Sequence, residues 1–326
     1  MRAIVFREHG GSDVLKLEAQ WPRPVPGPHE ALIEIKVCAL NFLDIFVRRG
    51  MPNKKTEFPH ISGGDGAGVV AELGSAVTGV TVGQRVLIDP AVPEGALGED
   101  TQGLMAQFAV VAAANLIPLP DDVSFEDAAA LPIGYGTAWR LMMDRGQVRL
   151  GETVFIHGAS GGVGTACVQI GKLAGATVYA GSSSAAKRAR LTELGADAVI
   201  DTSAVDWGRQ LWQLTGKQGV DMVVDYSGKD TWPTSVRSVK KGGRILTCGA
   251  TSGFEAVTDL RYVWTREETI IGSDGWTREG LLSLVDLVRR KKIRPVIDRV
   301  VPMSDVQAAE DALERREAFG KILLVP

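Results

Sequence analysis

The sequence lacks the marks of several protein classes. It has 3 cysteines, and Cys38, Cys167 and Cys248 lie far apart in the chain. An odd number of scattered cysteines does not make a disulfide framework, so we expect a reducing compartment. No apolar run reaches the roughly 18 residues that a membrane span needs. The opening, MRAIVFREHG, is typical of a strand and lacks the apolar core of a signal peptide. These absences predict a cytoplasmic protein without a membrane partner.

Neither sign of charge is in large excess. The chain has 36 Lys and Arg against 39 Asp and Glu, a net charge of -3. A protein that binds nucleic acid concentrates its basic residues on one surface. The one dense basic run, Arg289 to Arg294, follows an apolar helical pattern, and cations are favoured at a helix C-terminus. We therefore expect a small-molecule substrate and no nucleic acid.

The length of 326 residues predicts two domains, because single cores rarely grow past roughly 250 to 300 residues. Residues 1–121 contain short apolar runs between Gly and Pro, which is typical of a β-rich domain. From residue 122 strands alternate with helices, which predicts a parallel, doubly wound α/β sheet. The predicted elements there are strands at Thr153–His157, Thr177–Ala180, Ala198–Ile200, Val220–Tyr226 and Arg244–Cys248, and helices at Gly162–Leu173, Ala185–Leu194 and Val205–Leu214. We place this domain at residues 122–267 and expect residues 268–326 to return to the first domain.

A glycine-rich turn follows the first of these strands, in TVFIHGASGGVG. Its spacing, from Ala159 through Gly161 to Gly164, suits a dinucleotide: Gly161 admits a pyrophosphate, and Gly164 lets the helix pack on the strand. The helix N-terminus supplies unpaired N–H groups for the phosphates. The alternative is a connection without ligand, but the strand before and the helix after favour a dinucleotide. The expected cofactor contacts in the turn are Ser160, Gly161, Gly162 and Val163.

The end of the next strand indicates which dinucleotide. An NAD site usually has an acid there, which binds the ribose hydroxyls. This chain instead has Ser182, Ser183 and Ser184, followed by Lys187 and Arg188. Small hydroxyls leave room for a 2′-phosphate, and a cation neutralises it. Ser184 capping the next helix is the alternative and is compatible with phosphate binding. We therefore predict NADPH, bound by Ser182, Ser183 and Lys187.

As a whole, the chain resembles the medium-chain dehydrogenase/reductase superfamily. The motifs that carry the resemblance are the opening MRAIVF, Gly27-Pro28 before Glu30, Gly63–Gly68, Gly83 before Arg85-Val86, Thr137-Ala138-Trp139, Ser160–Gly164 and Gly320-Lys321. The resemblance implies a GroES-like β-barrel catalytic domain, a Rossmann domain and a homodimer or homotetramer.

The resemblance also implies where zinc-dependent members hold their metal. The catalytic ligands, two cysteines and a histidine, are replaced here by Asn41, Gly64 and Ile133, and none of these is a typical zinc ligand. The lobe that holds a structural zinc falls near Asp89–Gln107, which has no cysteine. We therefore expect no metal at either position.

Without a Lewis acid, a simple carbonyl is hard to polarise, whereas a conjugated acceptor spreads the charge it gains. The chain therefore resembles the quinone oxidoreductase/enoyl reductase branch. In that branch Asn41 and Asp44 lie beside the nicotinamide, and we expect Asn41 to donate a hydrogen bond and Asp44 to orient it. The alternative for both is local loop capping.

Other site residues are less constrained. Tyr135 could face the pocket as a proton donor and Tyr226 could line the nicotinamide, although packing is the alternative for both and water could supply the proton. By resemblance, Thr137 contacts the nicotinamide, Gly249 and Ser273 lie along its ribose and amide, and Lys321 reaches the pyrophosphate. Thr269–Ser273 would form the dimer edge.

The leading prediction is an NADPH-dependent, zinc-free reductase of quinones or α,β-unsaturated carbonyls. A second is a carbonyl/alcohol oxidoreductase acting on an aldehyde, ketone or alcohol. A third is a non-catalytic NADPH-binding protein, which no residue of the sequence favours.

Overall fold

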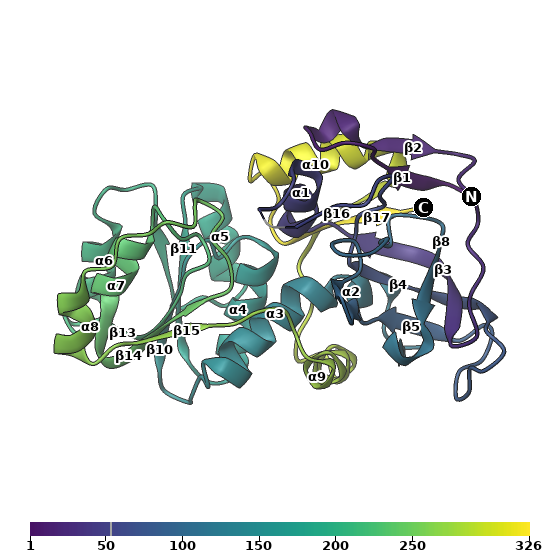
Figure 1. Cartoon of the computed structure of the whole chain (residues 1–326). Coiled ribbons are helices and arrows are strands. Elements are labelled where there is room, and N and C mark those ends of the chain that lie inside the picture. The colour runs from purple at the N-terminus through teal and green to yellow at the C-terminus, as the bar shows by residue number, and fades with distance from the viewer. Residues whose placement is uncertain (53) are drawn as a thin grey trace. The chain divides into compact units, whose positions relative to one another are not determined.

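The computed structural model describes residues 1–52 and 54–326 (Figure 1). Contacts within the chain divide it into two compact units. The first unit comprises Met1–Gly134 and Leu281–Pro326, and the second unit comprises Tyr135–Gly280. The second unit is therefore inserted, in sequence, into the first.

The first unit contains a seven-stranded sheet in which six strands follow the order β16-β17-β3-β4-β5-β9, with β8 also paired to β3. These strands are β3 (Glu30–Ala39), β4 (Asp65–Leu73), β5 (Arg85–Ile88), β8 (Phe108–Ala112), β9 (Leu116–Pro118), β16 (Ile297–Pro302) and β17 (Lys321–Val325). Two small sheets join β1 (Ala3–Val5) to β2 (Lys16–Glu18) and β6 (Ala91–Val92) to β7 (Gly95–Ala96). Strand β3 is apolar along most of its length because β4, β8 and β17 all pair with it and bury it.

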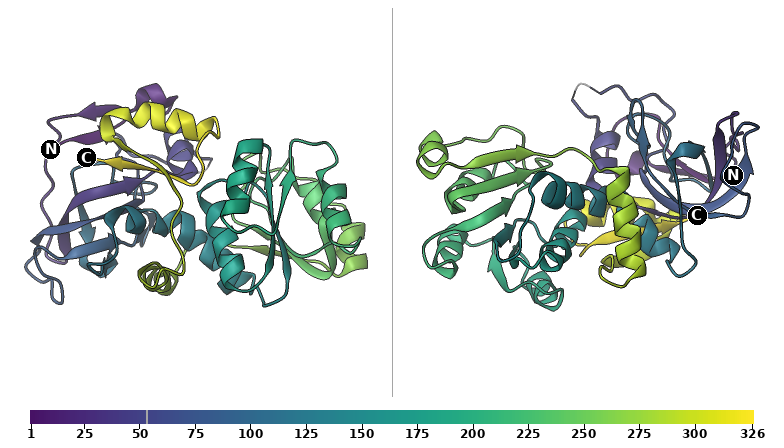
Figure 2. Two further views of the ribbon diagram at one scale, coloured as in Figure 1. Left: turned by 180° about the vertical axis from the view of Figure 1, so that it is seen from behind. Right: turned by 90° about the horizontal axis from the view of Figure 1, so that it is seen from below.

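Helices and short 3-10 turns pack around this sheet. They are α1 (Phe42–Arg49), α2 (Phe125–Ala129), α10 (Val306–Glu314), η1 (Ser12–Val14), η2 (Ala113–Asn115) and η5 (Met303–Asp305). Helices α1 and α10 are joined by a buried ion pair in which Arg48 Nε lies 2.7 Å from Glu310 Oε2. The C-terminal segment, yellow in Figure 2, thus returns to the N-terminal elements, as the sequence predicted.

The second unit is a six-stranded parallel sheet in the order β12-β11-β10-β13-β14-β15. Its strands are β10 (Thr153–Ile156), β11 (Thr177–Ser182), β12 (Ala198–Asp201), β13 (Val220–Val224), β14 (Val239–Thr247) and β15 (Thr269–Gly272). Numbered along the chain, this order is 3-2-1-4-5-6, that of a Rossmann fold. The expected doubly wound α/β sheet is confirmed.

Helices lie on both faces of this sheet (Figure 1). They are α3 (Thr137–Trp139), α4 (Gly162–Leu173), α5 (Ala185–Glu193), α6 (Trp207–Leu214), α7 (Trp232–Ser238) and α8 (Leu260–Arg266). Two π-helical turns, η3 (Leu131–Gly136) and η4 (Arg140–Arg145), flank α3, and α9 (Arg278–Arg289) leads back to the first unit. Within the ranges that the structure describes, no helix is both long enough and apolar enough to cross a membrane.

The unit boundaries differ from those expected at residues 121/122 and 267/268. Helix α2 stays with the first unit because it contacts β3, β4 and β5 and buries Ala128 and Ala129 there. Strand β15 belongs to the second unit because it pairs in parallel with β14, from Arg244 opposite Thr269 to Thr247 opposite Gly272. An apolar run at residue 269 does not reveal its partner strand, which is why the sequence placed it in the wrong domain.

Candidate functional site

The glycine-rich turn of the second unit connects β10 to α4. Gly158 has a positive φ of 61°, and α4 begins at Gly162 after the N-cap Gly161. A Cβ on Gly164 would lie 2.6 Å from the backbone of Ala159, so only glycine allows this packing of helix on strand. A Cβ on Gly161 would meet only the Gly158 carbonyl, at 3.8 Å. Gly161 is therefore open to a ligand, beside the unpaired N–H groups of the first helical turn.

Tyr226 lies under this turn. Its hydroxyl donates to the Gly158 carbonyl at 2.9 Å. The Tyr226 hydroxyl oxygen would also lie 2.6 Å from a Cβ added to Gly164. Burial raises the pKa of the phenol well above its ordinary value. The structure thus places the Tyr226 hydroxyl beneath the glycine-rich turn, and its expected contact with the nicotinamide stays a prediction.

The cofactor-specificity position lies at the end of β11. Ser182 is buried, Ser183 is exposed, and the Ser184 hydroxyl caps α5 by accepting from the Lys187 N–H at 3.4 Å. Arg188 Nη1 donates to the Ser182 carbonyl at 2.9 Å, and its Nη2 lies 3.0 Å from the Asp201 carboxylate at the end of β12. The guanidinium is thereby fixed over the end of β11. Helix capping, the alternative considered for Ser184, is present together with this cation.

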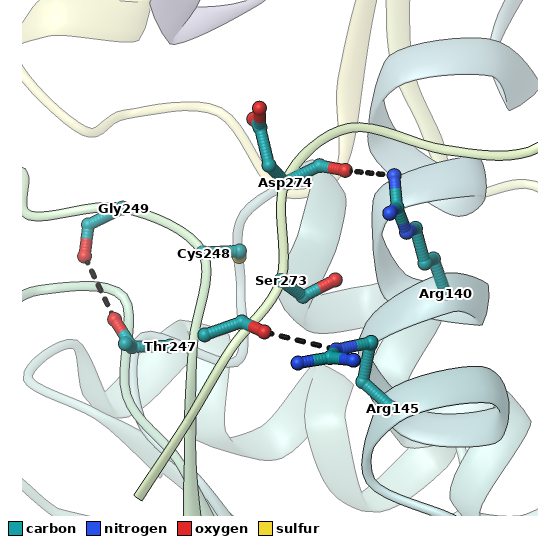
Figure 3. A pocket seen from close by; sticks show the side chains of 8 residues that line it. Arg140, Arg145, Thr247, Cys248, Gly249, Ser273 and Asp274 are labelled. Carbon is teal, nitrogen blue, oxygen red and sulfur yellow. Dashed lines mark hydrogen bonds between the residues drawn. The ribbon is translucent and has the colours of Figure 1, made fainter.

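A pocket of about 560 Å³ opens at the carboxyl ends of β14 and β15 (Figure 3). Parallel sheets bind their ligands at this edge. The predicted residues Gly249 and Ser273 both line the pocket, and the Ser273 hydroxyl is buried without a hydrogen-bond partner in the described structure. Thr137 is buried at the start of α3 in the same unit.

Two arginines that the sequence analysis did not single out also line this pocket. Arg145 Nε donates to the Gly272 carbonyl at 3.1 Å, and Arg140 Nη1 donates to the carbonyl of Asp274. The sequence could have indicated them, because both follow the Thr137-Ala138-Trp139 motif on the helical turn that continues from it. Cys248 also lines the pocket, but burial raises the pKa of its thiol to about 12, so it remains protonated and is a poor nucleophile.

Tyr135 lies in the interior of the protein. Its side chain is fully buried, and its hydroxyl accepts a hydrogen bond from Gln169 Nε2 of α4 at 2.8 Å. The expectation that it is a proton donor is therefore not supported, and packing, the alternative, describes its position.

In the first unit, Asn41 and Asp44 lie at the junction of β3 and α1. The Asp44 carboxylate accepts from the Asn41 N–H at 2.7 Å through Oδ2, and from Ser62 Oγ and the Gly63 N–H, each at 3.1 Å, through Oδ1. Burial raises the pKa of Asp44 to about 6, although the Asn41 N–H and the Lys321 charge favour the ionised form. Asp44 thus caps α1 and holds the backbone of Asn41.

The side chain of Asn41 belongs to a buried cluster with Asp65 and Lys321. Lys321 Nζ donates to Asp65 Oδ2 at 2.8 Å and to Asn41 Oδ1. Asn41 Nδ2 donates to Asp65 Oδ2 at 2.9 Å and makes a longer contact of 3.4 Å with the Ala39 carbonyl. Asp65 Oδ1 accepts from the Ile133 N–H at 2.7 Å. The Lys321 ammonium is therefore held by Asp65 and Asn41 of the first unit, and its expected contact with the pyrophosphate stays a prediction.

The positions that hold zinc in metal-dependent members meet at this cluster. A Cβ on Gly64 would lie 2.7 Å from Ile133 Cδ1, so these two positions are in contact and contribute only apolar atoms. The nearby carboxylate of Asp65 is already paired with Lys321. Zinc needs thiolate, imidazole or free carboxylate donors. The residues present do not fit the ion, and within residues 1–52 and 54–326 no group of three or more His, Cys, Asp or Glu is placed to hold a metal.

Comparisons with known proteins agree with this architecture. Residues 27–121 match the family described as "Alcohol dehydrogenase GroES-like domain", and residues 162–290 match "Zinc-binding dehydrogenase". The quinone oxidoreductase of Mus musculus is 30% identical over 334 residues, covering 100% of this chain and 98% of the relative. That of Rattus norvegicus is 29% identical over 332 residues, with the same coverage.

A solved structure entitled "NAD-dependent alcohol dehydrogenase" superposes with a TM-score of 0.95 at 37% identity, and each chain is covered completely. The first unit therefore contains the expected GroES-like domain, and the second is the Rossmann domain that accompanies it. The chain belongs to the medium-chain dehydrogenase/reductase superfamily of pyridine-nucleotide-dependent oxidoreductases.

Proposed function

We propose that the protein transfers hydride from NADPH to a quinone or an α,β-unsaturated carbonyl without zinc. The observation that carries this proposal is the Asn41–Asp65–Lys321 cluster. Its polar atoms are hydrogen-bonded to one another at the position where a metal would bind. The similarity to quinone oxidoreductases over nearly the whole chain supports the same acceptor class.

The acceptor class follows from the chemistry left to the protein. Hydride addition to a carbonyl places negative charge on one oxygen, which usually requires a Lewis acid or strong donors. In a quinone or enone the charge is delocalised through the conjugated system, so weaker stabilisation is sufficient. One N–H of Asn41 Nδ2 donates to Asp65, and the other makes only a long hydrogen bond of 3.4 Å to the Ala39 carbonyl, which an acceptor oxygen would replace.

The bound dinucleotide supplies the hydride. Its pyrophosphate would lie on the turn Ser160–Val163, and its nicotinamide end would lie near Thr137, Gly249 and Ser273. The 2′-phosphate would bind Ser182, Ser183 and Lys187, with the fixed guanidinium of Arg188 beside them. Because β11 ends in serine and the nearby Asp201 is paired with Arg188, the site favours a phosphate over two ribose hydroxyls.

The second candidate is an NAD-dependent alcohol or aldehyde oxidoreductase, and one observation favours it. A solved structure with that cofactor and activity in its title is 37% identical to this chain. The two candidates differ in cofactor, acceptor and need for metal, so one set of assays distinguishes them.

The experiment is a panel of initial rates with NADPH and NADH in parallel. The acceptors are 1,4-benzoquinone, 9,10-phenanthrenequinone, 2-cyclohexenone and benzaldehyde, each with and without EDTA. We expect NADPH oxidation with a quinone or the enone, unchanged by EDTA. Benzaldehyde as the best acceptor with an EDTA-sensitive rate would establish the second candidate, and equal rates with NADH would refute the cofactor assignment.

We also propose a homodimer joined through β15. This strand is the edge of the second unit's sheet, and Ile270 on it is 44% exposed. An apolar edge strand is a template for pairing with another chain. Light scattering after gel filtration should give twice the 34.8 kDa chain mass, and a monomer at micromolar concentration would refute the proposal.

The cysteines support a cytoplasmic location. Cys38 and Cys167 are free thiols buried in different units, and Cys248 is free as well. Free thiols persist in a reducing compartment. Fractionation of the native host should recover the protein with cytoplasmic markers, and a periplasmic or extracellular pool would contradict this.

A further inference from the structure

Lys321 is a buried cation at the position where zinc-dependent relatives carry their metal. Its side chain is 3% exposed, and that of its partner Asp65 is 0% exposed. The cluster brings together the end of β3, the start of β4 and the start of β17, three adjacent strands of one sheet. A buried ammonium needs a counter-charge and hydrogen-bond acceptors, and Asp65 and Asn41 supply them.

The ammonium determines the orientation of the Asn41 amide. With Oδ1 toward Lys321, Nδ2 faces Asp65, and the opposite orientation would bring the NH₂ group against the ammonium. The same contact polarises the amide, because hydrogen bonds in a chain strengthen one another. The Asn41 N–H groups are therefore stronger donors than those of an isolated amide.

We propose that Lys321 is a positioning residue for hydride transfer, which replaces the positive charge of the metal by orienting and polarising Asn41 toward the acceptor oxygen. This inference rests on the proposed function. A hydride carries two electrons to the electrophilic carbon, and the π electrons move to the acceptor oxygen. The resulting enolate or quinolate oxygen accepts a hydrogen bond from Asn41 Nδ2. A proton from water completes the reduction, and NADP⁺ remains.

Two other roles for Lys321 make different predictions. If its ammonium bound the cofactor pyrophosphate, its loss would weaken NADPH binding and leave kcat unchanged. If it served only as half of a structural ion pair, removal of both charges would leave kcat unchanged in a folded protein. The positioning role predicts a fall in kcat with little change in the KM for NADPH.

The decisive variant is the double substitution Lys321→Met with Asp65→Asn, because Lys321→Met alone would leave a buried carboxylate without its cation. Lys321→Arg keeps the charge and serves as the conservative rescue. Lys36→Met is the matched control, since it removes an exposed lysine paired with Glu34 on the same sheet. Circular dichroism and thermal melting establish that each variant is folded.

We expect kcat with a quinone to fall by roughly 10- to 100-fold in the double variant, less than the loss caused by removing a direct oxyanion donor. The KM for NADPH should stay within about threefold, because a positioning role leaves cofactor binding intact. Lys321→Arg should recover most of the rate, and Lys36→Met should match the wild type. Wild-type kcat in a folded double variant, or a change confined to the KM for NADPH, overturns the inference.

A binding measurement separates this inference from the proposed function. The probe is 4-nitrophenolate, an anion that mimics a quinolate, titrated into the NADP⁺-loaded protein by calorimetry. We expect the double variant to bind it at least about tenfold more weakly than the wild type, as expected for a weakened oxyanion donor. Equal affinity, or no binding to the wild type, overturns the inference. Absence of turnover with every acceptor in the panel refutes the proposed function instead.

Discussion

The two units form their candidate sites from different parts of the chain. The second unit uses backbone: glycines in one short turn leave open space beside the first N–H groups of α4. The first unit uses side chains that the fold brings together from residues 41, 65 and 321. A backbone site depends on the absence of side chains and a side-chain site depends on matched charges, so the two should respond to different substitutions.

The largest effect should come from a buried charge in the first unit that lies outside the cluster. Arg48 is fully buried, and its partners are Glu310, Glu314 and the Gly10 carbonyl. Arg48→Met should lower the free energy of unfolding by about 3–5 kcal/mol, because Glu310 would remain buried without its cation. Urea denaturation measures this. A loss below 1 kcal/mol would mean that water reaches Glu310 freely and that side-chain charge pairing matters less in this unit.

A smaller effect is expected from one methyl group in the turn of the second unit. Gly164→Ala should cost roughly 1–3 kcal/mol of stability, since its Cβ would lie 2.6 Å from the Ala159 backbone. Gly161→Ala is the matched control: its Cβ has no contact closer than 3.8 Å, so stability should be retained while NADPH binding weakens. Thermal melting and fluorescence titration separate the two. Equal melting temperatures for both variants would contradict the packing argument.

Glu268 tests how the second unit tolerates a carboxylate without a cation close by. Its side chain is buried, neither oxygen has a hydrogen-bond partner in the described structure, and Arg266 is 3.9 Å away. Burial raises its pKa to about 7, so the folded state favours the protonated form. The protonated Glu268 therefore adds its full contribution to the free energy of unfolding below the ordinary pKa of 4.5. This contribution is lost as the pH rises through 7 and the folded protein must hold a buried carboxylate.

Glu268→Gln should accordingly stabilise the protein by roughly 1–2 kcal/mol at pH 8 and have no effect near pH 4. Chemical denaturation of both proteins at the two pH values measures the difference. A pH-independent difference would show that folding does not change the pKa of Glu268.

The smallest effect concerns the hydroxyl beneath the turn. Tyr226→Phe removes the 2.9 Å hydrogen bond to Gly158 and keeps the ring, so stability should fall by about 1 kcal/mol. NADPH affinity should weaken slightly, because Gly158 would lose one constraint on its carbonyl. A large loss of kcat at unchanged affinity would instead restore the sequence-based prediction that Tyr226 lies along the nicotinamide.

Local patterns predicted local structure well. Helix α4 has the predicted bounds, because a glycine-rich turn marks its start and an apolar helical run marks its length. The motifs also identified Asn41, Gly64 and Ile133 as neighbours of one site, and the contact between Gly64 and Ile133 agrees with this. The residue type at one motif position can be read from the sequence without knowledge of the fold.

The partners of the polar side chains could not be predicted in the same way. Lys321 and Asp65 are separated by 256 positions, and only the pairing of β17 with β3 and of β3 with β4 brings them together. Tyr135 and Tyr226 are each close in sequence to a site motif, yet neighbouring helices and turns determine that their hydroxyls face Gln169 and Gly158. Nothing in the local sequence distinguishes a phenol that faces a ligand from one that packs.

The insertion of Tyr135–Gly280 within the first unit has a consequence for biosynthesis. A ribosome completes the whole Rossmann sheet before it makes β16 and β17, so the second unit can fold while the sheet of the first unit still lacks two strands. During that interval Asp65 has no cation, and water must solvate it. The Asn41–Asp65–Lys321 cluster therefore forms only with the last strand, after the whole Rossmann sheet has been made.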